Sequence, residues 1–376
     1  MLESTDPNAL VVETARRFAQ EKLAPTAAAR EQAGAIEKEI IEALGEMGFL
    51  GATNSAEWGG SEIPYEAYAQ VVEEIAAGDG SVSTLVSVHN APTCEILEKF
   101  GTPEQKERWL RPLASGQAVG SFALTEPSAG SDASGVRTRA VRTNSGYTIN
   151  GSKQFISNAR IGKTTILFAV TDPEAGKKGI SCFIVANDTP GFSVARVEHK
   201  LGQKASDSCA LSFDDMQVPD DQRIGAEGEG LKIALATLES GRIGIAAQSV
   251  GMARAALDYA IQYAKERKQF GRPIIEHQAV GFRLVEAKTR LAAARELTLR
   301  AARLKDAGQP ALEAAAMAKL FASEAAEAIC SAAIQTLGGY GYLADYPVER
   351  IYRDVRVCQI YEGTSDVQKI ILQRML

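Results

Sequence analysis

The stretch S-F-A-L-T-E-P-S-A-G-S-D at residues 121–132, with Y-T-I-N-G-S-K-Q-F-I-S at 147–157, decides the fold class of this chain. Both segments combine β-branched and aromatic residues with Gly, Pro, Asn and Asp, which is typical of short strands and turns. Asn150–Gly151 predicts the type I′ turn of a two-residue hairpin. Similar runs continue to about residue 220 and predict antiparallel strands in a barrel or sandwich. The expected strands are Ser121 to Thr125, Val136 to Arg142, Tyr147 to Ile149, Thr165 to Val170, Ile180 to Val185, Phe192 to Val197 and Cys209 to Phe213.

The segments on both sides of this β region have the spacing of helices. Before it, apolar residues recur every three or four positions, as at Ile36, Ile40, Leu44 and Met47. After a Gly-rich loop at 225–230, the chain becomes rich in alanine. We expect helices from about Leu231 to Phe270, ended by Gly271 and Pro273, and then at about 275–306 and 311–337.

These patterns divide the chain into three regions. We expect helices at residues 1–120, antiparallel strands at 121–228 and an antiparallel helical bundle at 229–376. A chain of 376 residues is long enough to form a separate core in each of them.

The composition excludes several classes of function. With 47 acidic and 41 basic side chains the net charge is −6, so no overall positive field favours nucleic acid or an anionic membrane. The five cysteines are scattered and the three histidines lie far apart, so we expect neither a disulfide framework nor a metal site. Neither a signal peptide nor a membrane-spanning stretch is recognisable. We expect a cytoplasmic protein, or one of the mitochondrial matrix if a transit peptide has been removed.

The loop at 122–132 is the first candidate site. Thr125, Ser128 and Ser131 carry hydroxyls, and Gly130 lets backbone amides approach a ligand closely, which suits phosphate oxygens or the edge of a heteroaromatic ring. The same residue types are common in solvent-exposed loops. Taken alone, the composition favours a plain loop.

The basic sequence R-K-Q-F-G-R at 267–272 is the second candidate site. Its cations concentrate at the end of the long predicted helix, where they interact favourably with the helix dipole. Beside an aromatic ring the same cluster suits a diphosphate, with Arg267 donating two parallel hydrogen bonds. Charge alone favours a solvated helix end.

The glycine-rich sequence Q-T-L-G-G-Y-G-Y at 335–342 is the third candidate site. From Gly339 to Ala344 it matches the dinucleotide fingerprint G-x-G-x-x-A, which binds only when a strand precedes it. Residues 314–333 are predicted to be helical, so we reject a Rossmann site. The bare backbone at Gly338–Gly339 remains suited to close approach of a ligand.

The sequence Y-E-G-T-S-D-V-Q at 361–368 is the fourth candidate site. Ser365 and Gln368 have capping-box spacing and predict a helix N-terminus able to receive an anion. Glu362 precedes that helix and becomes a general base if burial offsets the helix dipole, which by itself lowers the carboxyl pKa. Without such burial, Glu362 is a loop residue.

Taken in order, these motifs resemble the acyl-CoA dehydrogenase family, flavoenzymes that oxidise acyl-CoA thioesters to trans-2-enoyl-CoA. The resemblance covers nearly the whole chain. Each motif is moderately specific, but seven of them in the order of the family are hard to obtain by chance. They are T-E-P-S-A-G-S-D at 125–132, N-G-x-K-x-x-I-S-N at 150–158, E-H-K-L-G at 198–202, G-R-I-G at 241–244, R-x-x-F-G at 267–271, Q-x-L-G-G at 335–339 and Y-E-G-T-S at 361–365.

The resemblance implies three domains: a helical N-terminal domain at residues 1–120, an antiparallel β-barrel domain at 121–228 and a C-terminal four-helix-bundle domain at 229–376. It implies FAD in the cleft between barrel and bundle, a homotetramer built as a dimer of dimers, and electron-transfer flavoprotein as the partner that takes the electrons. It implies contacts with FAD for Phe122, Ala123, Leu124, Thr125, Gly130, Ser131, Phe155, Ile156, Ser157, Thr364, Ser365 and Asp366. It implies contacts with the FAD of a neighbouring subunit for Arg267, Phe270, Gln278, Gln335, Leu337, Gly338 and Gly339.

The resemblance also implies the reaction, which is of the kind used in fatty-acid β-oxidation. Glu362 takes the α-proton while the β-hydrogen leaves as hydride to flavin N5. The backbone N–H of Glu362 and a ribityl hydroxyl stabilise the developing enolate. Burial excludes water and raises the pKa of Glu362 towards that of the activated substrate. The CoA thioester is expected to contact Ser131, Glu239, Ser240, Gly241, Arg242 and Gly363.

Three positions depart from the commonest pattern of the family. Some relatives carry the catalytic Glu on the long helix, where this chain has Gly241, so Glu362 favours the short- and medium-chain type. Phe155 stands where many relatives have Trp, and Ser157 where Thr is frequent. The length and branching of the acyl chain stay open.

Two alternative functions differ from this interpretation. An oxygen-using acyl-CoA oxidase or flavin monooxygenase on the same fold produces peroxide at every turnover without an added acceptor. A non-catalytic helical interaction protein is colourless and takes up no FAD. An intact Glu362 among intact flavin motifs argues against the second alternative.

Overall fold

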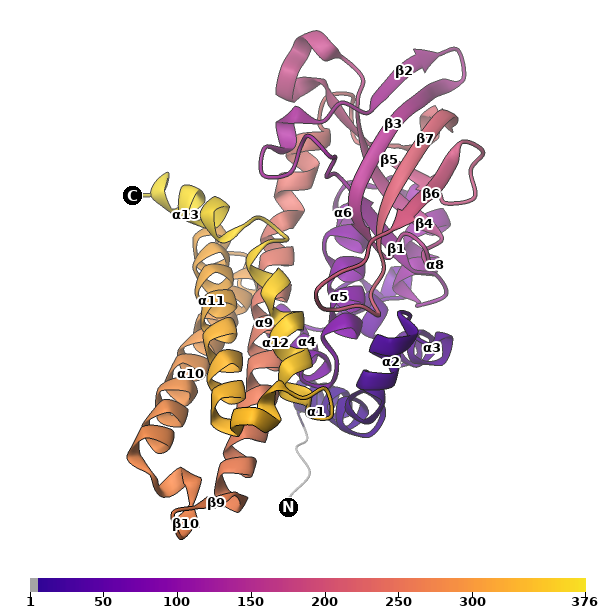
Figure 1. Cartoon of the computed structure of the whole chain (residues 1–376). Helices are drawn as coiled ribbons and strands as arrows, with labels where there is room; N and C mark the ends of the chain where they lie inside the picture. Colours follow the sequence, from indigo (N-terminus) through magenta and orange to yellow (C-terminus); the bar gives the residue numbers. More distant parts are fainter. Residues whose placement is uncertain (1–5) are drawn as a thin grey trace.

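The N-terminal part of the chain is helical, as its apolar spacing predicts (Figure 1). The computed structural model describes residues 6–376. Asp79 ends one helix and begins the next, since its side chain accepts hydrogen bonds from the backbone N–H groups of Ser81 and Val82. The helices are α1 (Pro7–Phe18), α2 (Ala27–Ala33), α3 (Lys38–Glu46), α4 (Tyr65–Gly78), α5 (Gly80–Val88), α6 (Glu95–Phe100), α7 (Pro103–Gln105) and α8 (Arg111–Ala114).

The middle region forms an eight-stranded sheet within the described residues. Its order is β6-β7-β3-β2-β4-β5-β8, with β1 beside β4. Most neighbours are antiparallel, but β1 and β2 both pair with β4 in parallel, which corrects the purely antiparallel expectation. The strands are β1 (Gly120–Ala123), β2 (Arg139–Thr143), β3 (Gly146–Ser157), β4 (Thr164–Val170), β5 (Ile180–Ala186), β6 (Phe192–Val197), β7 (Ser208–Pro219) and β8 (Arg223–Ile224).

The predicted hairpin turn at Asn150–Gly151 is wrong, because β3 runs through both residues. The turn of the hairpin lies earlier, between Thr143 and Gly146, which pair with each other at the ends of β2 and β3. The Asn150 side chain instead pairs with Asp215 on β7, donating from Nδ2 to Oδ1 at 2.9 Å. Gly151, at φ +148°, sits at a register irregularity between the two strands. The Asn-Gly signal therefore marks a bulge and not a turn.

Long helices form the C-terminal part, where α9 ends at Glu266, four residues earlier than predicted. Arg267 is extended, and the chain then makes a small hairpin whose turn holds Phe270 and Gly271 at φ +52° and +80°. Gly271 therefore belongs to the hairpin turn, and the helix ends before it. The elements are α9 (Gly230–Glu266), β9 (Lys268–Gln269), β10 (Arg272–Pro273), α10 (Gln278–Asp306), α11 (Leu312–Leu337), α12 (Pro347–Val355) and α13 (Ser365–Gln373).

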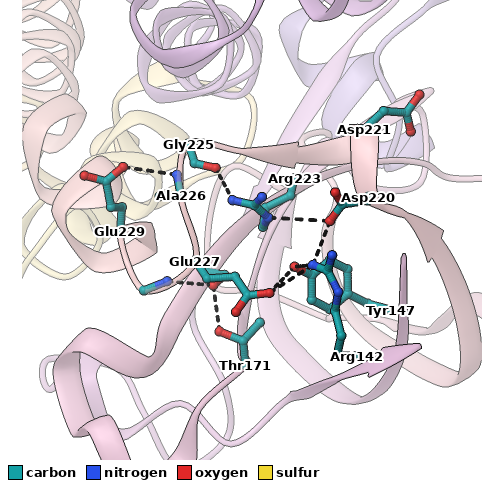
Figure 2. A network of polar contacts seen from close by, with 12 residues as sticks. Arg142, Tyr147, Thr171, Asp220, Asp221, Arg223, Gly225, Ala226, Glu227 and Glu229 are labelled. Atoms are coloured by element: carbon teal, nitrogen blue, oxygen red, sulfur yellow. Dashed lines mark hydrogen bonds and ion pairs between the residues drawn. The ribbon is translucent and has the colours of Figure 1, made fainter. Parts of the chain in front are cut away.

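A polar network ties the barrel to the loop that leads into α9 (Figure 2). Arg142 of β2 donates to Asp220 at 2.8 Å and to Glu227 at 3.0 Å, and the Tyr147 hydroxyl of β3 also donates to Glu227. The loop thereby has a fixed position where the barrel chain passes into the bundle. The charged members are about half exposed, so each ion pair contributes about 1 kcal/mol or less.

Helix α5 connects the barrel with the bundle. The carbonyl of Leu85 accepts a hydrogen bond from Asn158 Nδ2 at the end of β3, at 3.2 Å. On the other side, Gln248 of α9 donates to the hydroxyl of Ser83 at 2.7 Å. A Cβ on Gly244 would lie 2.5 Å from Ser87 Oγ, so glycine permits the close packing of α9 on α5. The end of β3, α5 and α9 therefore form one rigid junction.

None of the helices between residues 6 and 376 combines the length and apolar character needed to cross a membrane. No group of three or more His, Cys, Asp or Glu side chains with the geometry of a metal site occurs there either.

Candidate active site

Glu362 lies on a tight turn just before α13. It has φ +55° and the following Gly363 has φ +86°, a conformation that favours glycine. Thr364 caps α13 by accepting from Val367 N–H at 3.2 Å, so the predicted capping box of Ser365 with Gln368 is wrong by one residue. The Gln368 side chain instead turns back and donates to the Gly363 carbonyl at 2.9 Å. The turn is thus held by α13 itself.

The carboxylate of Glu362 points into the protein. Its Oε2 is buried and has no hydrogen-bond partner among the described residues. Burial raises the pKa of Glu362 to about 7, while the positive charges of Arg242 and Lys319 act in the opposite direction. The burial that the sequence required of a general base is therefore present.

Helix α9 brings Gly241 and Arg242 to the same carboxylate. A Cβ on Gly241 would lie 2.7 Å from Glu362 Oε2, so the glycine leaves the space into which the carboxylate projects. Arg242 is buried, and its Nε and Nη1 atoms have no partner among residues 6–376. Unpaired polar atoms of a buried cation and a buried carboxylate indicate a site for a polar ligand.

The other predicted substrate contacts lie in different surroundings. Ser240 is buried and donates to Glu95 at 2.8 Å, and Glu239 lies 3.9 Å from the ammonium of Lys305. Ser131 is exposed on the loop after β1. Gly363 adjoins Glu362 on the turn. The structure therefore brings Gly241, Arg242 and Gly363 to the carboxylate, whereas the Ser240 side chain faces Glu95.

The predicted flavin contacts of the barrel lie together where the last residues of β3 run beside β1 and the loop that follows it. Gln154 N–H donates to the Thr125 carbonyl at 2.9 Å, which places the loop after β1 beside Phe155. Phe155 has φ +61° and its side chain is 63% exposed. Ala123, Leu124 and Ile156 are buried, Phe122 and Ser157 partly buried, and Gly130 exposed with open space where a Cβ would lie.

Lys153 and Glu126 form a buried ion pair under this loop, a function that the sequence motifs did not reveal. Lys153 Nζ donates to Glu126 at 2.8 Å and to the Leu124 carbonyl at 3.0 Å. Glu126 also accepts from Arg137 N–H at 2.6 Å and Thr138 N–H at 3.0 Å. The pair fixes the backbone between β1 and β2. In the sequence, Lys153 stands between the polar residues Ser152 and Gln154, so no local signal indicates that it is buried.

Gln248 and Tyr361 close the space between α5, α9 and the Glu362 turn. The Tyr361 hydroxyl donates to Gln248 Oε1, and Gln248 Nε2 donates to Thr84 Oγ1 at 2.6 Å and to the Gly80 carbonyl at 3.0 Å. Neither side chain has a role in the sequence-based interpretation, because a glutamine within an Ala-rich helix carries no local signal and Tyr361 stood only as the first letter of a motif. Together they link α5 and α9 to the turn that carries Glu362.

The residues predicted to contact the FAD of a neighbouring subunit gather at the opposite end of the bundle from α13, near β9 and β10 (Figure 1), whereas Thr364, Ser365 and Asp366 lie at the start of α13 itself. A cavity of about 400 Å³ is lined there by Arg267, Leu337, Gly338 and Gly339. Phe270 is 95% exposed, and Gln278 and Gln335 are exposed as well. Helix α11 precedes the glycines, which confirms the rejection of a Rossmann site. One chain therefore holds two separate groups of predicted cofactor contacts.

The fold and the site define a three-domain enzyme that places a buried carboxylate between helices. The chain belongs to the acyl-CoA dehydrogenase family. Models of its N-terminal, middle and C-terminal domains match residues 5–117, 121–216 and 228–376.

Individual relatives agree along their whole length. An acyl-CoA dehydrogenase of Bacillus subtilis is 43% identical over 99% of this chain and 98% of its own. The structure of butyryl-CoA dehydrogenase from Megasphaera elsdenii is 41% identical, with a TM-score of 0.97, and covers 100% of this chain and 99% of that one. A structure from work on the electron transferring flavoprotein of Acidaminococcus fermentans has a TM-score of 0.97 and 43% identity, and covers the same shares.

These similarities confirm the predicted family, the three-domain fold class and the enzyme class, an oxidoreductase of the acyl-CoA dehydrogenase type. The roles of single residues at the site stay predictions, and so do the domain boundaries at 120/121 and 228/229.

Proposed function

We propose that this protein is a short-chain acyl-CoA dehydrogenase in which Glu362 removes the α-proton of the thioester. One observation carries the proposal: Oε2 of Glu362 is buried without a hydrogen-bond partner among residues 6–376, and burial raises the pKa of the carboxyl to about 7. A base with a pKa near the working pH combines a large ionised fraction with strong driving force for proton transfer.

FAD is the cofactor, and the residues present fit it. Gly338 and Gly339 leave open space where a Cβ would lie, so a dinucleotide can approach their backbone closely. Ser365 Oγ is buried at the start of α13 and has no partner in the described part of the chain, and Phe155 offers an exposed ring beside Thr125. When bound, FAD supplies the acceptor for the β-hydride.

The chain's own residues prepare the proton transfer. The fixed turn at Glu362 aims the carboxylate at the space beside Gly241, and the backbone N–H of Glu362 is suited to donate to the thioester oxygen. Arg242 keeps positive charge beside the site and favours the ionised carboxylate. Burial excludes water and strengthens each of these interactions.

We propose that the substrate carries a short acyl chain. Two of the relatives found at 42% identity are named as short-chain specific acyl-CoA dehydrogenases. The similarity to a butyryl-CoA dehydrogenase supports the same choice, because its named substrate has a four-carbon acyl group.

We further propose that electrons pass to electron-transfer flavoprotein and that the enzyme is a homotetramer in the cytoplasm. The distance between the two groups of cofactor contacts supports an assembly in which the Gly338–Gly339 cavity serves the FAD of a neighbouring subunit. The similarity to a structure from work on electron transferring flavoprotein supports the acceptor. We propose domain boundaries at 120/121 and 228/229.

The Glu362→Gln variant tests the base. It keeps the shape of the side chain but cannot accept a proton. We expect FAD binding to persist, and the anaerobic bleaching of the flavin by butyryl-CoA to slow by about 10²- to 10⁴-fold.

Glu324→Gln is the control, since Glu324 is a half-exposed carboxylate of α11. Near-normal bleaching in Glu362→Gln would overturn the assignment of the base. Stoichiometric peroxide from the wild-type enzyme without an added acceptor would instead select the oxidase.

A further inference from the structure

Lys319 lies on α11 behind the turn that carries Glu362, and it is outside every group of predicted site residues. Its side chain is fully buried, and its Nζ donates to the Gly363 carbonyl at 2.6 Å. The same face of α11 carries small residues three or four positions from Lys319, namely Ala315, Ala316 and Ala322. Their small side chains leave room for the long lysine side chain to reach the turn.

The contacts of Lys319 differ from those of a structural buried lysine. Lys153, which is equally buried, makes an ion pair with Glu126 at 2.8 Å. Within residues 6–376, Lys319 has no carboxylate at ion-pair distance, and its hydrogen bond goes to a backbone carbonyl. A buried ammonium without a paired carboxylate is costly, which indicates that its charge serves another group.

Charged and titratable groups surround the pair formed by Lys319 and the Glu362 turn. Electrostatic interactions reach Lys319 from Cys358, Glu362, Arg242 and Glu324, and they reach Glu362 from Arg242, Lys319 and Tyr68. Arg242 is therefore the second cation of the site, and it lies on α9, across from α11.

We propose that Lys319 is a positioning residue for the proton transfer that we assign to Glu362, an inference that rests on the proposed function. Its ammonium anchors the Glu362–Gly363 turn through the Gly363 carbonyl and keeps a positive charge near the carboxylate. Gln368 donates to the same carbonyl at 2.9 Å, but it is neutral, so Lys319 alone combines the anchor with a charge.

The charge sets the fraction of enzyme that is ready to accept a proton. Burial raises the pKa of Glu362 to about 7, and Lys319, after Arg242, limits that rise. Burial lowers the pKa of Lys319 to about 8, so its ammonium is still protonated where Glu362 titrates. Without the charge of Lys319, less of the enzyme has an ionised Glu362 at neutral pH.

Lys319→Met removes the charge and the hydrogen bond, Lys319→Gln keeps a donor without a charge, and Lys319→Arg keeps the charge. The ascending limb of the pH profile of kcat/KM reports the base of the free enzyme. We expect Lys319→Met and Lys319→Gln to move this limb upward by about one pH unit or more. Lys319→Arg should return it towards the wild-type position.

A second measurement is independent of turnover. The pH dependence of the melting temperature of the FAD-loaded variants follows the titration of Glu362, and its midpoint should move in the same direction. Ile329→Ala, a buried apolar truncation on the same helix, is the control, because it should lower the melting temperature without moving the limb.

The result that contradicts this role is an ascending limb of kcat/KM that stays at the wild-type position in both Lys319→Met and Lys319→Gln, with rates reduced evenly at every pH. This result would show that Lys319 has only a structural role. If the methionine variant fails to fold, the Gln and Arg variants give the same comparison. If Glu362→Gln is active, the proposed function is overturned. If Glu362→Gln is inactive but the ascending limb of the Lys319 variants does not move, only the role of Lys319 is overturned.

Discussion

The barrel and the bundle each bury a glutamate beside a lysine, with opposite results. In the barrel, Glu126 accepts from Lys153 and from two backbone N–H groups. Burial alone would raise the pKa of Glu126, but the Lys153 ammonium and the Thr138 donors outweigh it, and the net pKa is lowered. In the bundle, Glu362 keeps an unpaired oxygen and a raised pKa.

The difference shows that hydrogen bonds, more than burial or charge, separate a carboxylate with a lowered pKa from one with a raised pKa. Glu126 has its acceptor sites occupied, so it holds the loop after β1 and has little tendency to take a proton. Glu362 faces the cations Arg242 and Lys319 without a direct bond to either. Its remaining acceptor capacity is available to a substrate proton.

The largest effect is expected from breaking the barrel pair with Lys153→Met. The substitution leaves Glu126 buried without its cation, which costs about 3 to 5 kcal/mol of unfolding free energy. Lys163→Met, at an exposed barrel lysine, is the matched control. The double variant Glu126→Gln with Lys153→Met should recover part of the loss in chemical denaturation. A loss below about 1 kcal/mol in the single variant would contradict the comparison.

The two glutamates should also differ in how stability depends on pH. The folded-state pKa of Glu362 lies above its unfolded value, so its contribution is fully present below about pH 4.5 and is lost as pH rises through about 7. The free energy of unfolding of Glu362→Gln should therefore rise relative to that of the wild type between about pH 5 and 8, by roughly 3 kcal/mol at most.

Glu126→Gln should show the opposite trend, because the lowered pKa of Glu126 contributes stability above its unfolded pKa that is lost in acid. Melting curves of both variants and the wild type, recorded across this pH range, check the signs. If stability relative to the wild type depends on pH in the same way in both variants, the two carboxylates do not differ in the direction of their pKa shifts.

The smallest effect is expected from Gly241→Ala, which narrows the space of the reactive carboxylate. The new Cβ would lie 2.7 Å from Glu362 Oε2, and the flexible glutamate side chain must shift. We expect flavin reduction to slow by about tenfold, as misplacement of a catalytic group does. Stability should hold or rise by up to about 1 kcal/mol, since alanine favours a helix interior. Unchanged reduction kinetics would show that the carboxylate does not fill this space.

The sequence predicted the order of helical and β regions because apolar spacing and β-branched runs are local signals. At Glu362 the local pattern, a glycine turn before a helix N-terminus, favoured a loop residue, and the assignment as the base came from the resemblance and stays a prediction. The turn at Asn150–Gly151 failed because pairing of β3 with β7 overrode a local preference. The end of α9 was misplaced because Gly271 serves a hairpin turn that depends on pairing between Gln269 and Arg272.

By itself, then, the sequence determined the family motifs, the helical and β segments and the candidate base. Only the tertiary structure decided that Lys153 pairs with Glu126, that Gln248 meets Tyr361, and that Lys319 reaches the Glu362 turn. These partners lie 27 to 113 residues apart in the chain, as their hydrogen bonds show. Burial and hydrogen bonding across such distances arise from packing, and they determine which of two similar glutamates can accept a proton.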